Sequence, residues 1–270
     1  MTLFPHMKLT QQDHADLKRA HTLIENEPFL IRVSNVIGKP ITFALEKLPG
    51  STTEIVVKAT NKSLDICLQS ALATMTSQKK TSASNWFHKM LVAGTGGLGG
   101  FWGLPALAIE LPVTTGIMLR SIADIARSEG ENLSDVETQL ACISVFGLEG
   151  GKKSDDDSDT GFYASRIAIA KMVKEAAEYF AKSTSKKVVE KTTAPVLVKL
   201  LQQISSRFSI TVSEKAAAQA LPFIGAAIGA TINTLFMDYY QDMARGHFIL
   251  RRLERKYSTD FIRSEYEKLG

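Results

Sequence analysis

The chain has 270 residues, of which 44% are hydrophobic and 22% are charged, and its formal net charge is +4. This composition is typical of a globular protein that can bury a substantial core, as one large domain or two smaller ones. The small positive charge falls well short of that of a dedicated nucleic-acid-binding protein, so we expect no nucleic-acid partner. It does favour contact with an anionic membrane face.

Apolar residues recur with helical spacing along almost the whole chain, and no segment shows the alternation of a half-buried strand. An early apolar stripe ends before Pro28, and a longer one from Phe29 to Leu48 is expected to kink at Pro40. Further helices are expected in the second half of the chain, at residues 162–182, 194–208, 222–256 and 260–268. The sequence therefore predicts an all-α fold.

Three segments carry a capping box, in which a hydroxyl caps the third helical amide and a glutamate three residues later bonds back. These boxes begin at Ser51, Ser134 and Thr211, and each precedes an apolar run with helical spacing. We therefore expect a helix to begin at each of them.

The clearest break in the helical pattern is a stretch at residues 150–161 that is rich in Gly, Ser and Asp. Such a composition is typical of an exposed loop. We therefore expect residues 1–270 to form a single helical domain. Its two halves, about 1–149 and 162–270, would be joined by this acidic loop, and each half contains one long segment without charged residues.

The two charge-free segments are residues 90–109 and 216–237. Each is about as long as the roughly 20 apolar residues that a membrane-crossing helix needs. Both, however, are rich in Gly and Ala and are interrupted by proline. Pro105 and Pro112 argue against one straight span, and they favour a bent or re-entrant element that dips into the membrane without crossing it.

Small residues in the two segments fall on one face of each predicted helix. Glycine costs about 1 kcal/mol relative to alanine inside a helix, so such clusters usually serve the close approach of two backbones. We expect the two segments to pack on each other, with one asparagine amide bonding across the contact; the alternative is that each is a tight helix in a soluble core. The expected packing residues are Gly96, Gly100, Gly103, Gly225, Gly229 and Asn233.

Glu110 lies between two prolines in otherwise uncharged surroundings. A carboxylate there is costly unless it is paired, so we expect a buried polar contact with Arg120 as the candidate partner. The alternative is a partly exposed glutamate in the first turn of the next helix. The other candidates for buried polar contacts are Asp124, Asp238, Asp242 and His247, and the aspartates at 238 and 242 share a helix face.

No motif in the sequence predicts a cofactor or a metal ion, and we expect neither. Residues 94–99 match the dinucleotide fingerprint in letters, but no convincing strand precedes them and Pro105 interrupts the following helix. The acidic loop lacks the Gly and the Glu that an EF-hand requires. Cys67 and Cys142 stand far apart in apolar surroundings, and we expect both to be buried, reduced thiols.

From about Pro28 to its end the chain resembles the EcsC family of bacterial proteins. The resemblance rests on residues 102–112, 118–130, 150–166, 221–233 and 244–254, of which 221–233 (LPFIGAAIGATIN) is the most specific. Glu110 stands where the family more often carries Asp, and residues 155–159 form an acidic insertion. The resemblance implies an all-helical protein that is often membrane-associated, and a founding member encoded beside an ABC transporter. It implies no established reaction.

We therefore expect a non-enzymatic, membrane-associated helical protein, peripheral or re-entrant on the cytoplasmic side of the bacterial inner membrane. It would contact the membrane lipid surface and support a transporter or an envelope process. One alternative is a hydrolase acting on lipid or peptide, in which Glu110, Asp238, Asp242 and His247 converge. The other alternative is a soluble helical module that binds a partner.

Overall fold

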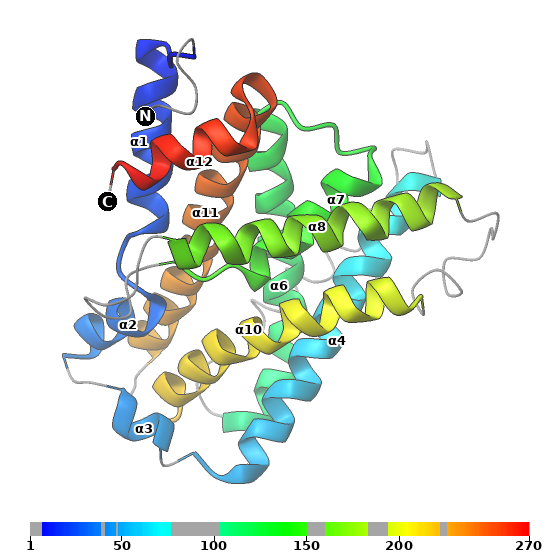
Figure 1. Ribbon diagram of the computed structural model, residues 1–270. Coiled ribbons are helices and arrows are strands. Elements are labelled where there is room, and N and C mark those ends of the chain that lie inside the picture. The colour runs from blue at the N-terminus through cyan, green and yellow to red at the C-terminus, as the bar shows by residue number, and fades with distance from the viewer. Residues whose placement is uncertain are drawn as a thin grey trace.

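The computed structural model describes residues 7–38, 41–46, 48–76, 103–150, 160–182, 194–221 and 226–269. Within these ranges the chain forms ten α-helices, one short 3-10 helix and no strand, so the prediction of an all-α protein is confirmed (Figure 1). The helices are α1 (Gln11–Ile24), α2 (Phe29–Ile37), α3 (Thr42–Glu46), α4 (Gly50–Thr76), α6 (Gly103–Ser128), α7 (Val136–Ser144), η1 (Val145–Gly147), α8 (Thr160–Lys182), α10 (Pro195–Gln219), α11 (Ala226–Tyr257) and α12 (Thr259–Glu267).

The long helix α11 is surrounded by helices from both halves of the chain. It packs against α1, α2, α6 and α12, while α6 also packs along α4. Helices α8 and α10 contact each other and cross in front of this group (Figure 1). Helices α1 and α12 lie at one end of the molecule, and α2 and α3 lie toward the other end.

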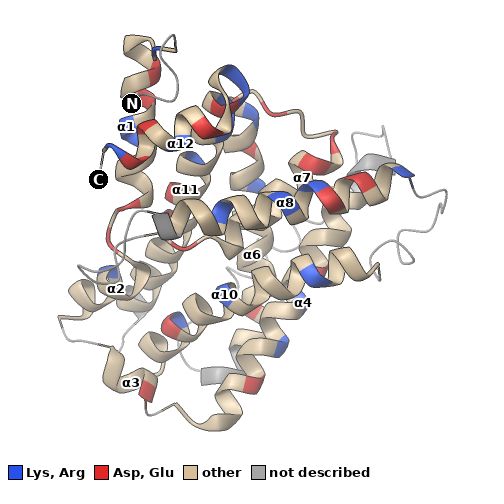
Figure 2. Cartoon of the chain, in the orientation of Figure 1, with Lys and Arg blue, Asp and Glu red and all other residues tan. Residues whose placement is uncertain are grey.

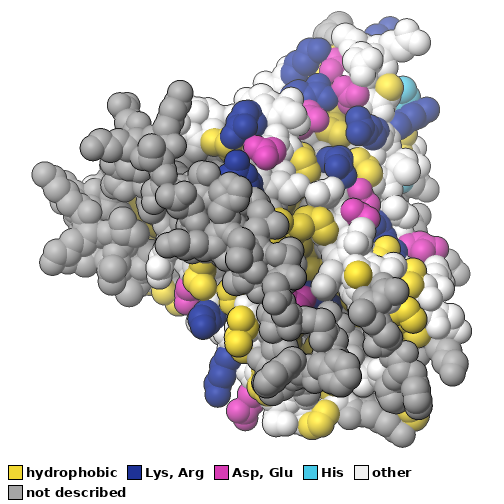
Figure 3. Space-filling model, turned by 180° about the vertical axis from the view of Figure 1, so that it is seen from behind, with side chains coloured by type: hydrophobic (Ala, Val, Ile, Leu, Met, Phe, Trp, Pro, Cys, Tyr) yellow, Lys and Arg dark blue, Asp and Glu magenta, His cyan; other side chains and the backbone are white. Residues whose placement is uncertain are grey.

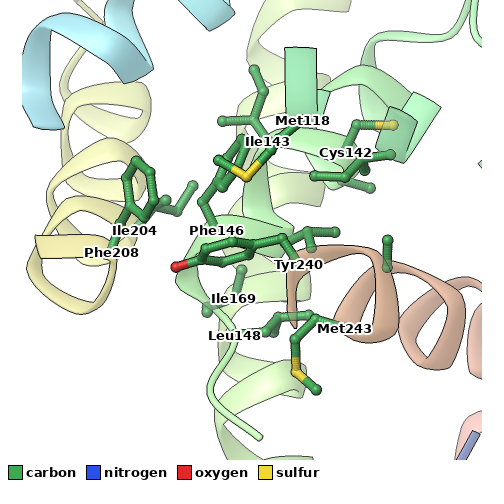
Figure 4. Close-up of a cluster of buried hydrophobic side chains, with 14 of the residues drawn as sticks. Met118, Cys142, Ile143, Phe146, Leu148, Ile169, Ile204, Phe208, Tyr240 and Met243 are labelled. Carbon is green, nitrogen blue, oxygen red and sulfur yellow. The ribbon is translucent and has the colours of Figure 1, made fainter. Parts of the chain in front are cut away.

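Aromatic rings from three elements meet in the centre of the core. The Phe146 ring in η1 lies 4.9 Å from that of Phe208 in α10 and 5.2 Å from that of Tyr240 in α11. Figure 4 shows these rings beside Met118 of α6 and Ile204 of α10. Edge-to-face and offset arrangements of this kind add to the stabilisation that burial alone provides. One contiguous core therefore joins residues that are far apart in the sequence.

All three predicted helix caps differ from the structure, two of them by only one or two residues. Thr211 lies inside α10, because Thr211 and Val212 are buried and the packed face of that helix continues through them. Helix α7 begins at Val136 with Asp135 as its N-cap, so the predicted cap at Ser134 is one residue early. Helix α4 begins at Gly50, so Ser51 lies inside its first turn and is not its cap. The expected kink at Pro40 lies outside the described residues.

Helix α6 continues through Pro112 without a break, while most of the first charge-free segment, residues 90–102, lies outside the described residues, so its expected bend stays a prediction. Pro105 lies in the first turn, where no backbone hydrogen bond is lost. At Pro112 one bond is lost, but packing against α4 and α11 holds the helix on both sides. Within the described ranges, no helix combines the length and the apolar character that crossing a membrane would require.

Helices α6 and α11 pack on each other. No described atom lies within 4 Å of a Cβ atom added at Gly229, but most of the segment expected to face it lies outside the described residues, so its role in packing stays a prediction. The Asn233 Oδ1 accepts a hydrogen bond from Gln219 Nε2 of α10 at 3.4 Å, not from α6. Gly103 is the first residue of α6, and the predicted packing residues Gly96, Gly100 and Gly225 lie outside the described residues.

The glycine that allows a close helix contact lies farther along α11. A Cβ atom added at Gly246 would lie 2.5 Å from Ile24 Cγ1 and 3.2 Å from the Ala20 carbonyl oxygen, both in α1. Gly150 is equally tight, because a Cβ there would collide with the Ile24 carbonyl oxygen and the Met243 side chain. Among the described residues, close backbone approach therefore joins α11 to α1.

We predict that Gly246→Ala lowers the free energy of unfolding by about 1 kcal/mol, because overpacking against α1 outweighs the better helix propensity of alanine. The matched change Gly229→Ala, in the same helix, should raise it by about 0.5–1 kcal/mol, since the added methyl group meets open space. Urea unfolding of both variants measures the difference. Equal effects at the two positions would contradict the assignment of the contact to Gly246.

Candidate functional site

A buried lysine joins three helices near the charge-poor end of the core. The side chain of Lys215 in α10 is 0% exposed, and its Nζ donates a hydrogen bond to Glu110 Oε1 of α6 at 2.8 Å. The same Nζ lies 4.8 Å from the centre of the Phe236 ring in α11. Burial lowers the pKa of Lys215, and the charge of Glu110 acts against this shift. The carboxylate and the ring face therefore balance a buried ammonium.

The expected polar contact of Glu110 exists, but its partner is Lys215 and not Arg120. Arg120 lies ten residues farther along the same helix, which is about 15 Å at 1.5 Å per residue, and it is exposed. Lys215 is 105 residues away from Glu110 in the sequence. Local sequence patterns hold no signal for such a long-range pair.

Asp242 binds an arginine that holds helix α2 against α11. Its Oδ2 accepts a hydrogen bond from Arg32 Nη1 at 3.0 Å, and Arg245 Nη1 lies 3.5 Å from its Oδ1. The Arg32 guanidinium also lies 5.6 Å from the centre of the Tyr239 ring. Asp238, one turn earlier, is exposed. Asp242 is therefore paired with arginines while Asp238 faces the solvent, although both lie on one helix face.

Arg166 of α8 forms a buried pair with Glu254 of α11. Its Nη1 and Nη2 donate hydrogen bonds to the two carboxylate oxygens at 2.6 and 2.7 Å, and the Tyr163 hydroxyl donates another at 2.7 Å. Burial alone would lower the pKa of Arg166, but the hydrogen bonds and the charge of Glu254 outweigh it and raise that pKa. This two-point geometry fixes the position of α8 on α11.

His247 completes this buried group as a neutral imidazole. Its Nδ1 lies 3.2 Å from Arg166 Nε, which donates to it, so the ring proton sits on Nε2. Nε2 is buried and has no hydrogen-bond partner among the described groups. Burial lowers the pKa of His247 well below its usual range, and the positive charges of Arg166 and Arg251 act in the same direction.

The four residues of the hydrolase hypothesis do not share one site. Glu110 is paired with Lys215 and Asp242 with Arg32, whereas His247 contacts Arg166. Positions 242 and 247 differ by about 140° around the axis of α11, because each residue turns the helix by about 100°. The described geometry therefore offers no acid–base group built from these side chains.

Asp124, the acidic and metal-ligating side chains and the two cysteines form no reactive group among the described residues. Asp124 is an exposed partner of Arg127, 3.1 Å away in the same helix. Among the residues that the structure describes, no three His, Cys, Asp or Glu side chains are grouped closely enough to hold a metal ion. Cys67 and Cys142 are buried and form no disulfide, as predicted.

The C-terminal turns of α11 carry an ion-pair network that no local sequence pattern predicts. Arg251 Nε donates to Glu131 Oε1 at 2.9 Å, and Arg252 binds Glu129 at 2.7 Å and Asp16 of α1 at 2.8 Å. Burial would raise the pKa of Glu131, but its arginine partners outweigh this and lower it. Figure 2 shows the charges of both signs that gather on α1, α11 and α12.

Helices α2 and α3 present a contrasting apolar surface toward the other end of the molecule. The α2–α3 face, as we name it, consists of the exposed side chains of Ile31, Val36 and Phe43, which are 42%, 42% and 60% exposed. The first half of α11, residues 226–237, carries no charge either. Seen from behind, charged side chains gather in the upper part of the molecule, and apolar ones show between the grey atoms lower down (Figure 3).

The described residues therefore contain buried polar contacts that hold helices together, as well as exposed apolar side chains that include those of the α2–α3 face. The EcsC protein family model matches residues 32–253 of the chain, which is most of its length. No curated protein and no solved structure gives a significant match. The match agrees with the resemblance found in the sequence and with the all-helical structure.

We predict that Glu110→Gln lowers the free energy of unfolding by about 3 kcal/mol, because it leaves the buried Lys215 ammonium without a counter-charge. Asp124→Asn serves as the control, since it removes an exposed pair on the same helix and should change stability by less than about 0.5 kcal/mol. Urea unfolding at pH 7 measures both. Equal small effects would contradict the importance of the Lys215 contact.

We further predict that stability falls as the pH drops from 6.5 to 5.5, by up to about 1.4 kcal/mol per pH unit. Below pH 6.5 the unfolded chain binds a proton at His247, while burial keeps the folded imidazole neutral. His247→Gln should reduce this slope, because its amide oxygen still accepts from Arg166 but does not titrate. The exposed His14→Gln is the control and should keep the slope. An unchanged slope in His247→Gln would contradict the account.

Proposed function

We propose that this chain, which belongs to the EcsC protein family, attaches peripherally to an anionic membrane surface through its α2–α3 face. On the cytoplasmic side of a bacterial inner membrane it would support a transporter or an envelope process. The observation that carries the proposal is the separation of exposed apolar side chains on α2 and α3 from the ion-paired end of the molecule. The proposal requires no helix to cross the bilayer.

The way in which α2 is attached supports this role. Its inner side buries Phe29 and Val33 in the core, and the pair between Arg32 and Asp242 ties it to α11. Ile31, on the side of α2 opposite Phe29 and Val33, and Val36, in the last turn of the helix, are both exposed to the surroundings. A short helix with its polar contacts satisfied inward and apolar groups outward is suited to lie in the plane of a lipid interface.

The charge of the chain contributes only modestly to binding at an anionic membrane surface. The net charge of +4 attracts an anionic surface, while most charges on α11 are already matched by partners within the protein. Burial of the apolar α2–α3 face would therefore supply most of the binding free energy, and the charge would add to it. Binding should consequently keep a large part of its strength at raised salt concentration.

Vesicle sedimentation tests this proposal. The wild-type chain should sediment with vesicles that contain anionic lipid, and the double change Ile31→Ser and Phe43→Ser should weaken binding by about tenfold or more, because two large apolar side chains no longer enter the interface. Tyr179→Ser, which removes an exposed aromatic residue from α8, should leave binding unchanged. Circular dichroism confirms that each variant is folded.

Two outcomes would contradict the proposal. If the double variant binds as well as wild type, the α2–α3 face is not the membrane contact. If the wild-type chain does not sediment with vesicles at all, a soluble module that binds a partner becomes the better account.

A further inference from the structure

A groove of about 450 Å³ lies between α4 and α6, away from the α2–α3 face. Its walls are mainly apolar and consist of Ile66 of α4 with Ala108, Ile109, Pro112 and Val113 of α6. The Ile109 side chain is 63% exposed, the largest exposure among the large apolar side chains described. The volume falls within the roughly 300–1,000 Å³ range of sites that bind small molecules.

The rim of this groove carries a positive charge that has no carboxylate partner among the described residues. Lys62 is the charged side chain that lines the groove, beside the polar groups of Gln69 and Ser70 on the same helix. No ion pair of Lys62 occurs among the described residues, whereas Lys58, one turn earlier, lies 3.9 Å from Glu54. An apolar groove with one cation and two hydrogen-bonding groups at its edge complements a molecule with an apolar body and an anionic head.

From this complementarity we infer that the groove between α4 and α6 binds a free long-chain fatty acid. The acyl chain lies against Ile66, Ile109 and Val113, and the carboxylate pairs with the Lys62 ammonium. Covering Ile109 and its neighbours removes apolar surface from water, which supplies the main driving force. The site is separate from the proposed membrane contact and does not depend on it.

Calorimetric titration of the purified full chain with oleate tests the inference, at concentrations at which oleate remains monomeric. Wild type should bind one oleate. Ala108→Phe, which places a ring in the groove, should weaken binding at least tenfold, with an unchanged thermal unfolding midpoint. Val113→Phe on the same wall provides the same test if Ala108→Phe does not fold. Unchanged affinity in a folded groove-filling variant, or no binding by wild type, would overturn the inference.

The charge of the head group is tested separately. Lys62→Gln should weaken oleate binding by about fivefold, the upper end of what one exposed ion pair contributes. The same change should leave the binding of the uncharged oleyl alcohol unaltered. Lys58→Gln is the matched control on the same helix and should bind oleate like wild type. Phe43→Ser should also bind oleate normally, which separates this site from the α2–α3 face. Equal oleate binding by Lys62→Gln and wild type would overturn the assignment of an anionic ligand.

Discussion

Helix α11 can run through the core because the charges that it carries inward meet opposite charges from other helices. A buried charge that loses its partner destabilises a protein by several kcal/mol, so each pair strongly favours one arrangement of the two helices. The pairs therefore act as fixed points that set where α2, α8 and the turn after α6 lie on α11. These pairs are Asp242 with Arg32, Glu254 with Arg166, and Arg251 with Glu131.

This constraint also shapes the outer surface of the molecule. The matched charges lie on the second half of α11 and on the helices around it, which leaves the uncharged first half, residues 226–237, toward the opposite end. The buried pair of Lys215 with Glu110 satisfies two further charges inside the core. Because Arg32 pairs with Asp242, the outer side of α2 carries the exposed Ile31 without an exposed charge beside it. The pair of Arg32 with Asp242 thus both holds α2 on α11 and removes a positive charge from the outer surface of α2.

The local features of the fold could be predicted from the sequence, but most of the long-range contacts could not. Helical spacing predicted residues 162–182 and 260–268, close to the observed α8 and α12. The capping box at Thr211 gave a false helix start, because a local motif cannot indicate that packing continues the helix through it. The costly position of Glu110 was evident from its neighbours, but its partner comes from another helix. Gly246 illustrates the same limit, since no local pattern indicates that α1 approaches α11 most closely at this residue.

The most direct test of the account is the depth of α2 in a membrane, measured with a fluorophore on a single introduced cysteine. Burial raises the pKa of both native thiols, Cys67 and Cys142, to about 12, so an exposed cysteine should react first. A label at Val36→Cys should be quenched by lipids that carry a nitroxide on the acyl chain, and a label at Val198→Cys near the start of α10 should not. Equal quenching at both positions, or none at position 36, would contradict the account.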